Sequence, residues 1–167
     1  MIKIFILFIT FTILISAQQK NKQIVDEKSG KMMLIGVCDR TAFADTSFAW
    51  WFNSEYENYS PDSLSISILK PIMGNTTITI IMGSWCSDSR IEVPRFYKII
   101  DAVGYDADKL KLICVDRDKK SPDGEVEKLE IKLVPTFIFY IGGKEIGRVL
   151  ESPKKKMEED LVSILVN

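Results

Sequence analysis

The chain has 167 residues, which predicts one domain, and 46% of them are hydrophobic, enough to form a buried core. Its 22 Lys and Arg nearly balance its 23 Asp and Glu, so the sequence lacks the basic excess typical of nucleic-acid-binding proteins. The absence of histidine excludes Cys–His dyads and histidine ligands, and the three cysteines are not clustered, so we expect no metal site and no cofactor.

Residues 1–17 have the features of a secretory signal peptide. Lys3 precedes an apolar run that ends at about Ile15, and the small residues Ser16 and Ala17 follow. The run is shorter than the roughly 20 residues that a spanning helix needs; an uncleaved N-terminal anchor is the alternative. We therefore expect an exported protein of the periplasm or cell envelope, which contacts a membrane only if the leader is retained.

The polar residues 18–31 predict a flexible lead-in to a single folded domain, 32–167. Its first part, 32–73, is expected to be an N-terminal extension. The run "MMLIGV" has the length and apolarity of a short strand, and a helix is predicted within 43–59 because aromatic residues recur there on one helical face. We expect this face to pack against the domain, with partner binding as the alternative. Its residues are Phe48, Phe52, Tyr56 and Tyr59.

A second helix is predicted to begin at Pro61-Asp62 and to end near Gly74, where the core of the domain, 74–167, starts. The segment "TTITIIMG" at 76–83 is β-branched and almost wholly apolar. Continuous apolarity of this length predicts a strand that is buried on both faces of a sheet.

A helix is expected at 86–104, with Asp88 in its first turn and Gly104 as its stop signal. Pro94 lies inside this segment and is expected to kink the helix. The next strand is predicted at 109–116.

A short helix is predicted at 121–131, and two strands, 135–141 and 145–150, are expected to form a hairpin around Gly142-Gly143. A last helix follows, and its apolar face contains Met157, Leu161, Ile164 and Leu165. The order from residue 76 is therefore β-α-β-α-β-β-α. This order predicts an α/β sandwich, in which a central mixed sheet is flanked by helices.

The chemistry is expected at Cys86, which lies between a buried strand and the start of a helix. Unpaired N–H groups and the helix dipole stabilise negative charge there, and the thiolate is the reactive form of cysteine. Ser89 lies on the same helical face and either donates a hydrogen bond to the sulfur or is an ordinary first-turn residue. The negative charge of Asp88 either opposes a thiolate at Cys86 or only complements the helix dipole. Arg90 either offsets the charge of Asp88 or is an ordinary surface residue.

The stretch "TITIIMGSWCSDSRIEVP" resembles the strand, active-site turn and kinked helix of the thioredoxin superfamily. Trp85-Cys86 matches the family's Trp-Cys pair, and Pro94 matches its helix-kinking proline. The resemblance extends over about 74–166 and implies a thioredoxin-like three-layer sandwich. More narrowly, the chain resembles exported thioredoxin-like proteins of Bacteroidetes-type bacteria, which share "EVPRFYKI" and "LICVDR".

The stretch "LVPTFIFYIGGKEIGR" resembles the second signature of the same superfamily, a Val-Pro-Thr before a hairpin. The resemblance implies that Pro135 is a cis proline packed against the active-site sulfur. It also implies that Val134, with Pro135 and Thr136, binds an extended substrate peptide through its exposed backbone.

The sequence departs from a standard thioredoxin at two positions. Ser89 replaces the resolving cysteine, giving a Cys-x-x-Ser site, and Ile80 replaces the buried acid that assists it. A single thiol can form a mixed disulfide but needs another thiol for release. Cys114 is expected to fill the core, and Cys38 could pair with Cys86, pair with Cys114 or stay reduced.

We therefore expect a monothiol thiol–disulfide oxidoreductase that uses Cys86. The alternative is a redox-inactive binding module or holdase with the same fold. The expected partners are exported proteins that carry disulfides or free thiols, or low-molecular-weight thiols, and no nucleic acid.

Overall fold

The computed structural model describes residues 20–166, so the predicted signal peptide lies outside the described residues. A six-stranded sheet in the order β1-β2-β4-β3-β5-β6 forms the centre. β3 and β4 are parallel and the other neighbouring pairs are antiparallel, which confirms a mixed sheet. The strands are β1 (Lys22–Val25), β2 (Met32–Cys38), β3 (Thr76–Met82), β4 (Leu110–Cys114), β5 (Thr136–Ile141) and β6 (Lys144–Leu150).

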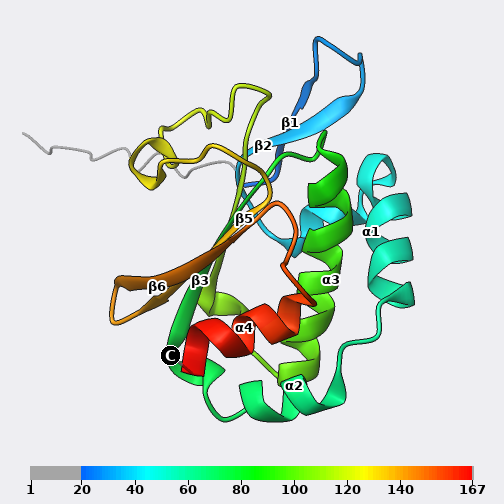
Figure 1. Ribbon diagram of the computed structural model, residues 1–167. Coiled ribbons are helices and arrows are strands. Elements are labelled where there is room, and N and C mark those ends of the chain that lie inside the picture. The colour runs from blue at the N-terminus through cyan, green and yellow to red at the C-terminus, as the bar shows by residue number, and fades with distance from the viewer. Residues whose placement is uncertain (1–19, 167) are drawn as a thin grey trace, which may run out of the picture.

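The α-helices of the described chain lie together beside one face of the sheet (Figure 1). α1 packs against α3, and α2 packs against both α3 and α4. No helix between residues 20 and 166 has the length and apolarity to cross a membrane. The α-helices are α1 (Thr46–Asn58), α2 (Ser63–Leu69), α3 (Ser87–Val103) and α4 (Met157–Val166), and the 3-10 turns are η1 (Arg40–Ala44), η2 (Met73–Asn75), η3 (Ala107–Lys109) and η4 (Glu127–Leu129).

Alternate residues of the central strand β3 face two separate cores, because successive side chains of a strand point to opposite faces. Ile80 and Met82 join the large core beneath the helices, whereas Ile81 joins a smaller core on the other face. The prediction of a strand buried on both faces is confirmed for these three residues, but Thr77 is exposed. The predicted α/β sandwich is confirmed.

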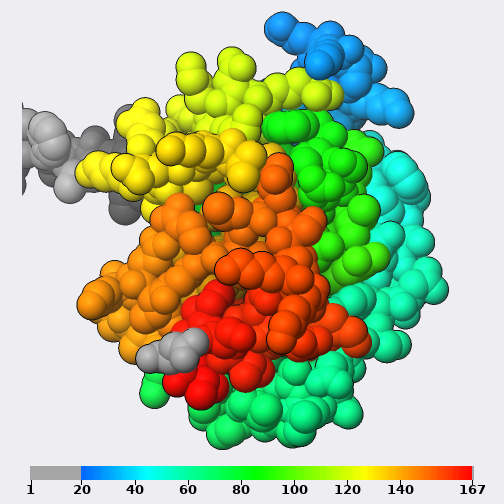
Figure 2. Space-filling model, in the orientation of Figure 1, coloured from blue at the N-terminus to red at the C-terminus, as the bar shows by residue number. Residues whose placement is uncertain are grey.

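The smaller core is covered by the segment 117–135, which Figure 2 shows in yellow against the β5–β6 hairpin in orange. The prediction of a short helix at 121–131 is wrong, because only the single turn η4 forms there. Gly124 and Glu130 have positive φ angles of 70° and 52°, so the backbone leaves the right-handed helical region on both sides of this turn.

The prediction of a flexible lead-in is wrong for the residues from Lys22 onward. β1 pairs with β2 along its whole length. The turn between them is held by the Asp26 carboxylate, which accepts hydrogen bonds from the Lys28 N–H and the Ser29 hydroxyl. A polar sequence forms a strand here because the neighbouring strand supplies its hydrogen bonds.

The predicted aromatic face of α1 packs inward as expected. Phe52 stacks on Phe43 with ring centroids 4.5 Å apart, and it also contacts Tyr97 of α3. Edge and stacked aromatic contacts add about 0.5–1.5 kcal/mol each beyond the area they bury. The N-terminal extension is thereby fixed to α3, the helix that directly follows Cys86.

Glu158, at the start of α4, is completely buried. Its carboxylate accepts hydrogen bonds from the Tyr59 hydroxyl at 2.6 Å and the Asp62 N–H at 2.7 Å. Burial and this contact raise the pKa of Tyr59. One carboxylate therefore joins the last helix to the segment between α1 and α2.

Candidate active site

Cys86 is the N-cap residue of α3 and lies directly after the turn that ends β3. Its N–H donates to the Gly83 carbonyl at 2.8 Å, and its carbonyl accepts the Arg90 N–H at 3.1 Å. The side chain is partly buried, and Sγ donates a hydrogen bond to the Val134 carbonyl at 3.2 Å. The thiol therefore lies where free N–H groups of the first helical turn stabilise a thiolate.

The predicted peptide-binding residues lie directly opposite this thiol. The Val134–Pro135 peptide bond is cis, the isomer that the resemblance implies. The Val134 carbonyl faces Cys86, and the hydrogen bonds among residues 20–166 leave the Val134 N–H unused. Thr136 is fully buried and donates from its hydroxyl to the Leu133 carbonyl at 2.7 Å, so it holds this loop and does not face a substrate.

Trp85 is fixed above the sheet on the face of the smaller core. Its indole N–H donates to the Val115 carbonyl at 2.9 Å. A Cβ atom at Gly83 would lie 2.5 Å from Trp85 Cε2, so only glycine leaves room for the indole there. The Arg117 guanidinium lies 5.0 Å from the centre of the ring, within the range of a cation–π contact.

Arg117 is held in place by Asp26 of the β1–β2 hairpin. Two hydrogen bonds join the side chains, from Nε to Oδ1 at 2.9 Å and from Nη2 to Oδ2 at 2.7 Å. The guanidinium, followed by the Ser29 hydroxyl, holds the pKa of Asp26 well below its usual range, and Asp26 raises the pKa of Arg117. The hairpin therefore supports the tryptophan of the active-site turn through one buried carboxylate.

We expect the Asp26→Asn variant to be less stable than the wild type at pH 7, and this difference to shrink in acid. The folded-state pKa of Asp26 is depressed, so the ionised group stabilises the fold above its unfolded pKa of about 3.9. That contribution is lost as the pH falls through the lower folded-state value. Denaturant midpoints measured from pH 7 down to pH 2 test this.

The control for this experiment is Glu27→Gln, which removes the adjacent exposed carboxylate. At pH 7 the midpoint of Asp26→Asn is expected to shift several times further than that of Glu27→Gln. Equal shifts in the two variants, or a difference from wild type that is constant down to pH 2, would contradict the role of Asp26.

The other predicted site residues have structural partners. Ser89 is fully buried, and its hydroxyl accepts the Gly83 N–H at 3.3 Å, so it braces the active-site turn and is not bonded to the sulfur. Arg90 donates from Nε to the Ser84 carbonyl at 2.6 Å. Burial lowers the pKa of Arg90, and its interaction with Cys86 opposes that shift. Asp88 lies half-buried in the first turn of α3, as predicted, and Pro94 lies buried within the helix.

The other two cysteines lie on the wrong side of the sheet to react with Cys86. Cys38 and Cys114 belong to the large core beneath the helices, whereas Cys86 packs against the smaller core on the opposite face. All three thiols are free. The suggestion that Cys38 pairs with Cys86 is therefore wrong for this fold, because the central sheet separates the two sulfurs.

Asp26, Gly83 and Arg117 were not predicted as site residues. Arg117 lies just after the end of β4, in the quoted "LICVDR" segment. Its place after a strand that neighbours β3 was the available signal that it could contact Trp85. Asp26 offered no comparable signal, because it lies in a polar segment and contacts Arg117, which is 91 positions further along the chain.

No family model matches the chain. The sequence is 24% identical to thioredoxin from Gallus gallus over 83 residues, 50% of this chain and 73% of that protein. It is 28% identical to thioredoxin from Malassezia sympodialis over 91 residues, 53% of this chain and 83% of that protein.

A solved structure from Pseudomonas aeruginosa, described as a protein of unknown function, aligns with a TM-score of 0.50 and 15% identity. The alignment covers 71% of this chain and 81% of that one, and it concerns the fold alone. The mixed sheet and the similarity to thioredoxins together support the assignment to the thioredoxin superfamily.

Proposed function

We propose that this chain is an exported thioredoxin-like protein that performs thiol–disulfide exchange with a single nucleophile, Cys86. The observation that carries the proposal is the contact between the Cys86 thiol, at the start of α3, and the Val134 carbonyl beside the cis Pro135. The redox class is supported by the similarity to thioredoxins. The export, to the periplasm or cell envelope, is supported by the sequence of residues 1–17.

The exchange begins when the Cys86 thiolate attacks one sulfur of a substrate disulfide. A bond forms between Cys86 and that sulfur, the substrate S–S bond breaks, and the second substrate sulfur leaves as a thiolate that takes up a proton. The N–H groups of the first turn of α3, together with Arg90, stabilise the attacking thiolate. An extended peptide is aligned by hydrogen bonds to the unused backbone N–H of Val134.

Release of the adduct requires a second thiol from another molecule. Within the described chain, Ser89 occupies the position three residues after Cys86, and the remaining cysteines lie across the sheet. An external thiolate attacks the substrate sulfur of the adduct, a new disulfide forms between those two molecules, and Cys86 returns as a thiol. Partners are therefore exported proteins with disulfides or thiols, together with a small thiol.

The alternative is a binding module or holdase without redox turnover. Two observations favour it. The Ser89 hydroxyl accepts a hydrogen bond from the Gly83 N–H, so the position of the resolving cysteine has a structural role in the turn. Ile80, at the position of the assisting acid, is fully buried among apolar side chains. Such a protein would hold peptides along Val134 and use Cys86 only as a small partly buried residue.

The proposal is tested by reacting the reduced protein with an aromatic disulfide reagent at pH 7. We expect one thiol per chain to react faster than free cysteine and the Cys86→Ser variant to lack this fast phase. Capture of exported proteins by the two forms separates the alternatives. Equal capture by wild type and Cys86→Ser, with no fast phase in either, would establish the binding module instead.

A further inference from the structure

The cysteines on the helix side of the sheet form a pair. β2 and β4 are antiparallel, with Gly36 opposite Cys114 and Cys38 opposite Leu112, so the two cysteines are diagonal neighbours. Both side chains face the same core and both are free. Interaction with the Cys114 thiol is the main cause that lowers the pKa of Cys38, and the same interaction, with burial, raises the pKa of Cys114.

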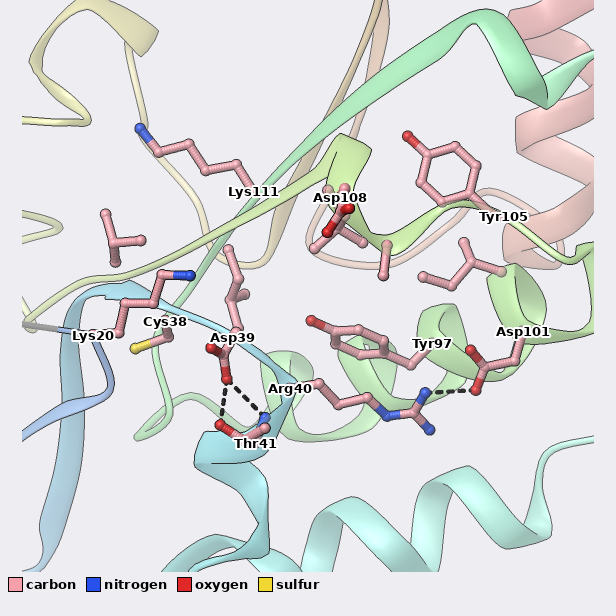
Figure 3. A pocket seen from close by; sticks show the side chains of 15 residues that line it. Lys20, Cys38, Asp39, Arg40, Thr41, Tyr97, Asp101, Tyr105, Asp108 and Lys111 are labelled. Carbon is pink, nitrogen blue, oxygen red and sulfur yellow. Dashed lines mark hydrogen bonds and ion pairs between the residues drawn. The ribbon is translucent and has the colours of Figure 1, made fainter.

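A pocket of about 520 Å³ reaches one member of this pair (Figure 3). Cys38 lines it, whereas Cys114 does not, and the volume lies within the usual range for small-molecule sites. Apolar side chains of β2, α3 and β4 form much of the wall, and Lys20 and Lys111 lie along it. The pocket is on the opposite side of the sheet from Cys86.

The hydroxyl of Tyr97 points into the same pocket. Tyr97 of α3 is only 4% exposed, and Figure 3 shows its hydroxyl directed toward the end of the pocket where Cys38 and Asp39 lie. No hydrogen bond among residues 20–166 involves this hydroxyl. A hydroxyl that has no partner in the described chain can bond a polar group of a ligand in the pocket.

We propose that Cys38 and Cys114 are a second redox centre, which a low-molecular-weight disulfide reaches through this pocket and oxidises to an intramolecular disulfide. A protein disulfide is too large to approach Cys38, which is 4% exposed at the base of the pocket. Cys38 reacts first because it lines the pocket, whereas Cys114 does not. Cys114, which is fully buried, reacts second.

The oxidation of the pair takes two exchange steps. The Cys38 thiolate attacks one sulfur of the small disulfide, a Cys38–sulfur bond forms, and the first small thiol leaves. The Cys114 sulfur then attacks the Cys38 sulfur, the Cys38–Cys114 bond forms, and the proton of Cys114 passes to the second leaving thiol. The protein loses two hydrogens and two electrons, and the small disulfide is reduced to two thiols.

The test uses the full chain with Cys86→Ser, so that its outcome is independent of the function proposed for Cys86. The folded, reduced protein is incubated with oxidised glutathione, and its thiols and disulfides are mapped by mass spectrometry. We expect a Cys38–Cys114 disulfide and two glutathione thiols released per chain. Adding Cys114→Ala is expected to stop the reaction at one glutathione on Cys38.

Access through the pocket is tested with Leu110→Trp in the same background. Leu110 lines the pocket and packs on the same core as Cys38, so the larger side chain is expected to slow oxidation several-fold, whereas Val25→Trp on the exposed edge of β1 is expected to change nothing. If both thiols survive in the folded Cys86→Ser protein and react only in denaturant, the pair is structural and the proposal is overturned. Equal rates in the two Trp variants and their parent would overturn the pocket route.

Discussion

The Ser89→Cys variant is expected to reduce protein disulfides with turnover, whereas the wild type is expected to stop after one mixed disulfide. Ser89 is one helical turn after Cys86 and is fully buried against the active-site turn. A thiol there would attack the adduct on Cys86 within the same molecule. Intramolecular groups act at very high effective concentrations, so we expect at least about a tenfold gain in insulin reduction over wild type.

The matched control for this variant is Ser87→Cys. Ser87 also lies in the first turn of α3, but its side chain is exposed and it directly follows Cys86. A thiol at 87 is expected to leave the activity at the wild-type level. If Ser89→Cys folds and also stays at that level, the groove between Cys86 and Val134 is not competent for disulfide exchange.

The Glu158→Ala variant is expected to show the largest loss of stability, about 2–4 kcal/mol in the free energy of unfolding. Removing the buried carboxylate leaves the Tyr59 hydroxyl and the Asp62 N–H without an acceptor, and each unsatisfied buried donor costs about 1–3 kcal/mol. Denaturant unfolding at pH 7 measures the change. Glu158→Gln retains one acceptor oxygen and is expected to lose about half as much.

Glu159→Ala provides the control for Glu158, because it changes the adjacent carboxylate of α4, which is only half-buried. We expect a loss within about 0.5 kcal/mol for this substitution. A loss at Glu159 equal to that at Glu158 would mean that the helix terminus, and not the two hydrogen bonds, is responsible.

The fold was predictable where periodicity and glycine signals were strong. The apolar run of β3, the stop at Gly104 and the Gly142-Gly143 turn each determine an element locally. The position of Cys86 was predictable for a similar reason, because the sequence alone places it between a strand and a helix.

The remaining features depend on contacts between distant residues. Asp26 and Arg117 meet only because β1 joins the sheet beside β2, and a polar strand of this length has no periodic signal. The separation of Cys38 from Cys86 depends on which face of the sheet each side chain occupies. The register of β2 against β4 determines that face for Cys38. The chain at 121–131 has helix-forming residues, but only the single turn η4 forms there. The backbone has positive φ angles at Gly124 and Glu130, on either side of that turn.

The central claim is that Cys86 forms a mixed disulfide that the protein cannot release by itself. The most direct test is to react the reduced Cys38→Ala/Cys114→Ala chain with a disulfide-bonded peptide and to follow its intact mass. We expect one peptide bound to Cys86, stable until a small thiol is added and then lost completely. If no adduct forms on the folded protein, or if it disappears without added thiol, the account of a single-cysteine exchange site is contradicted.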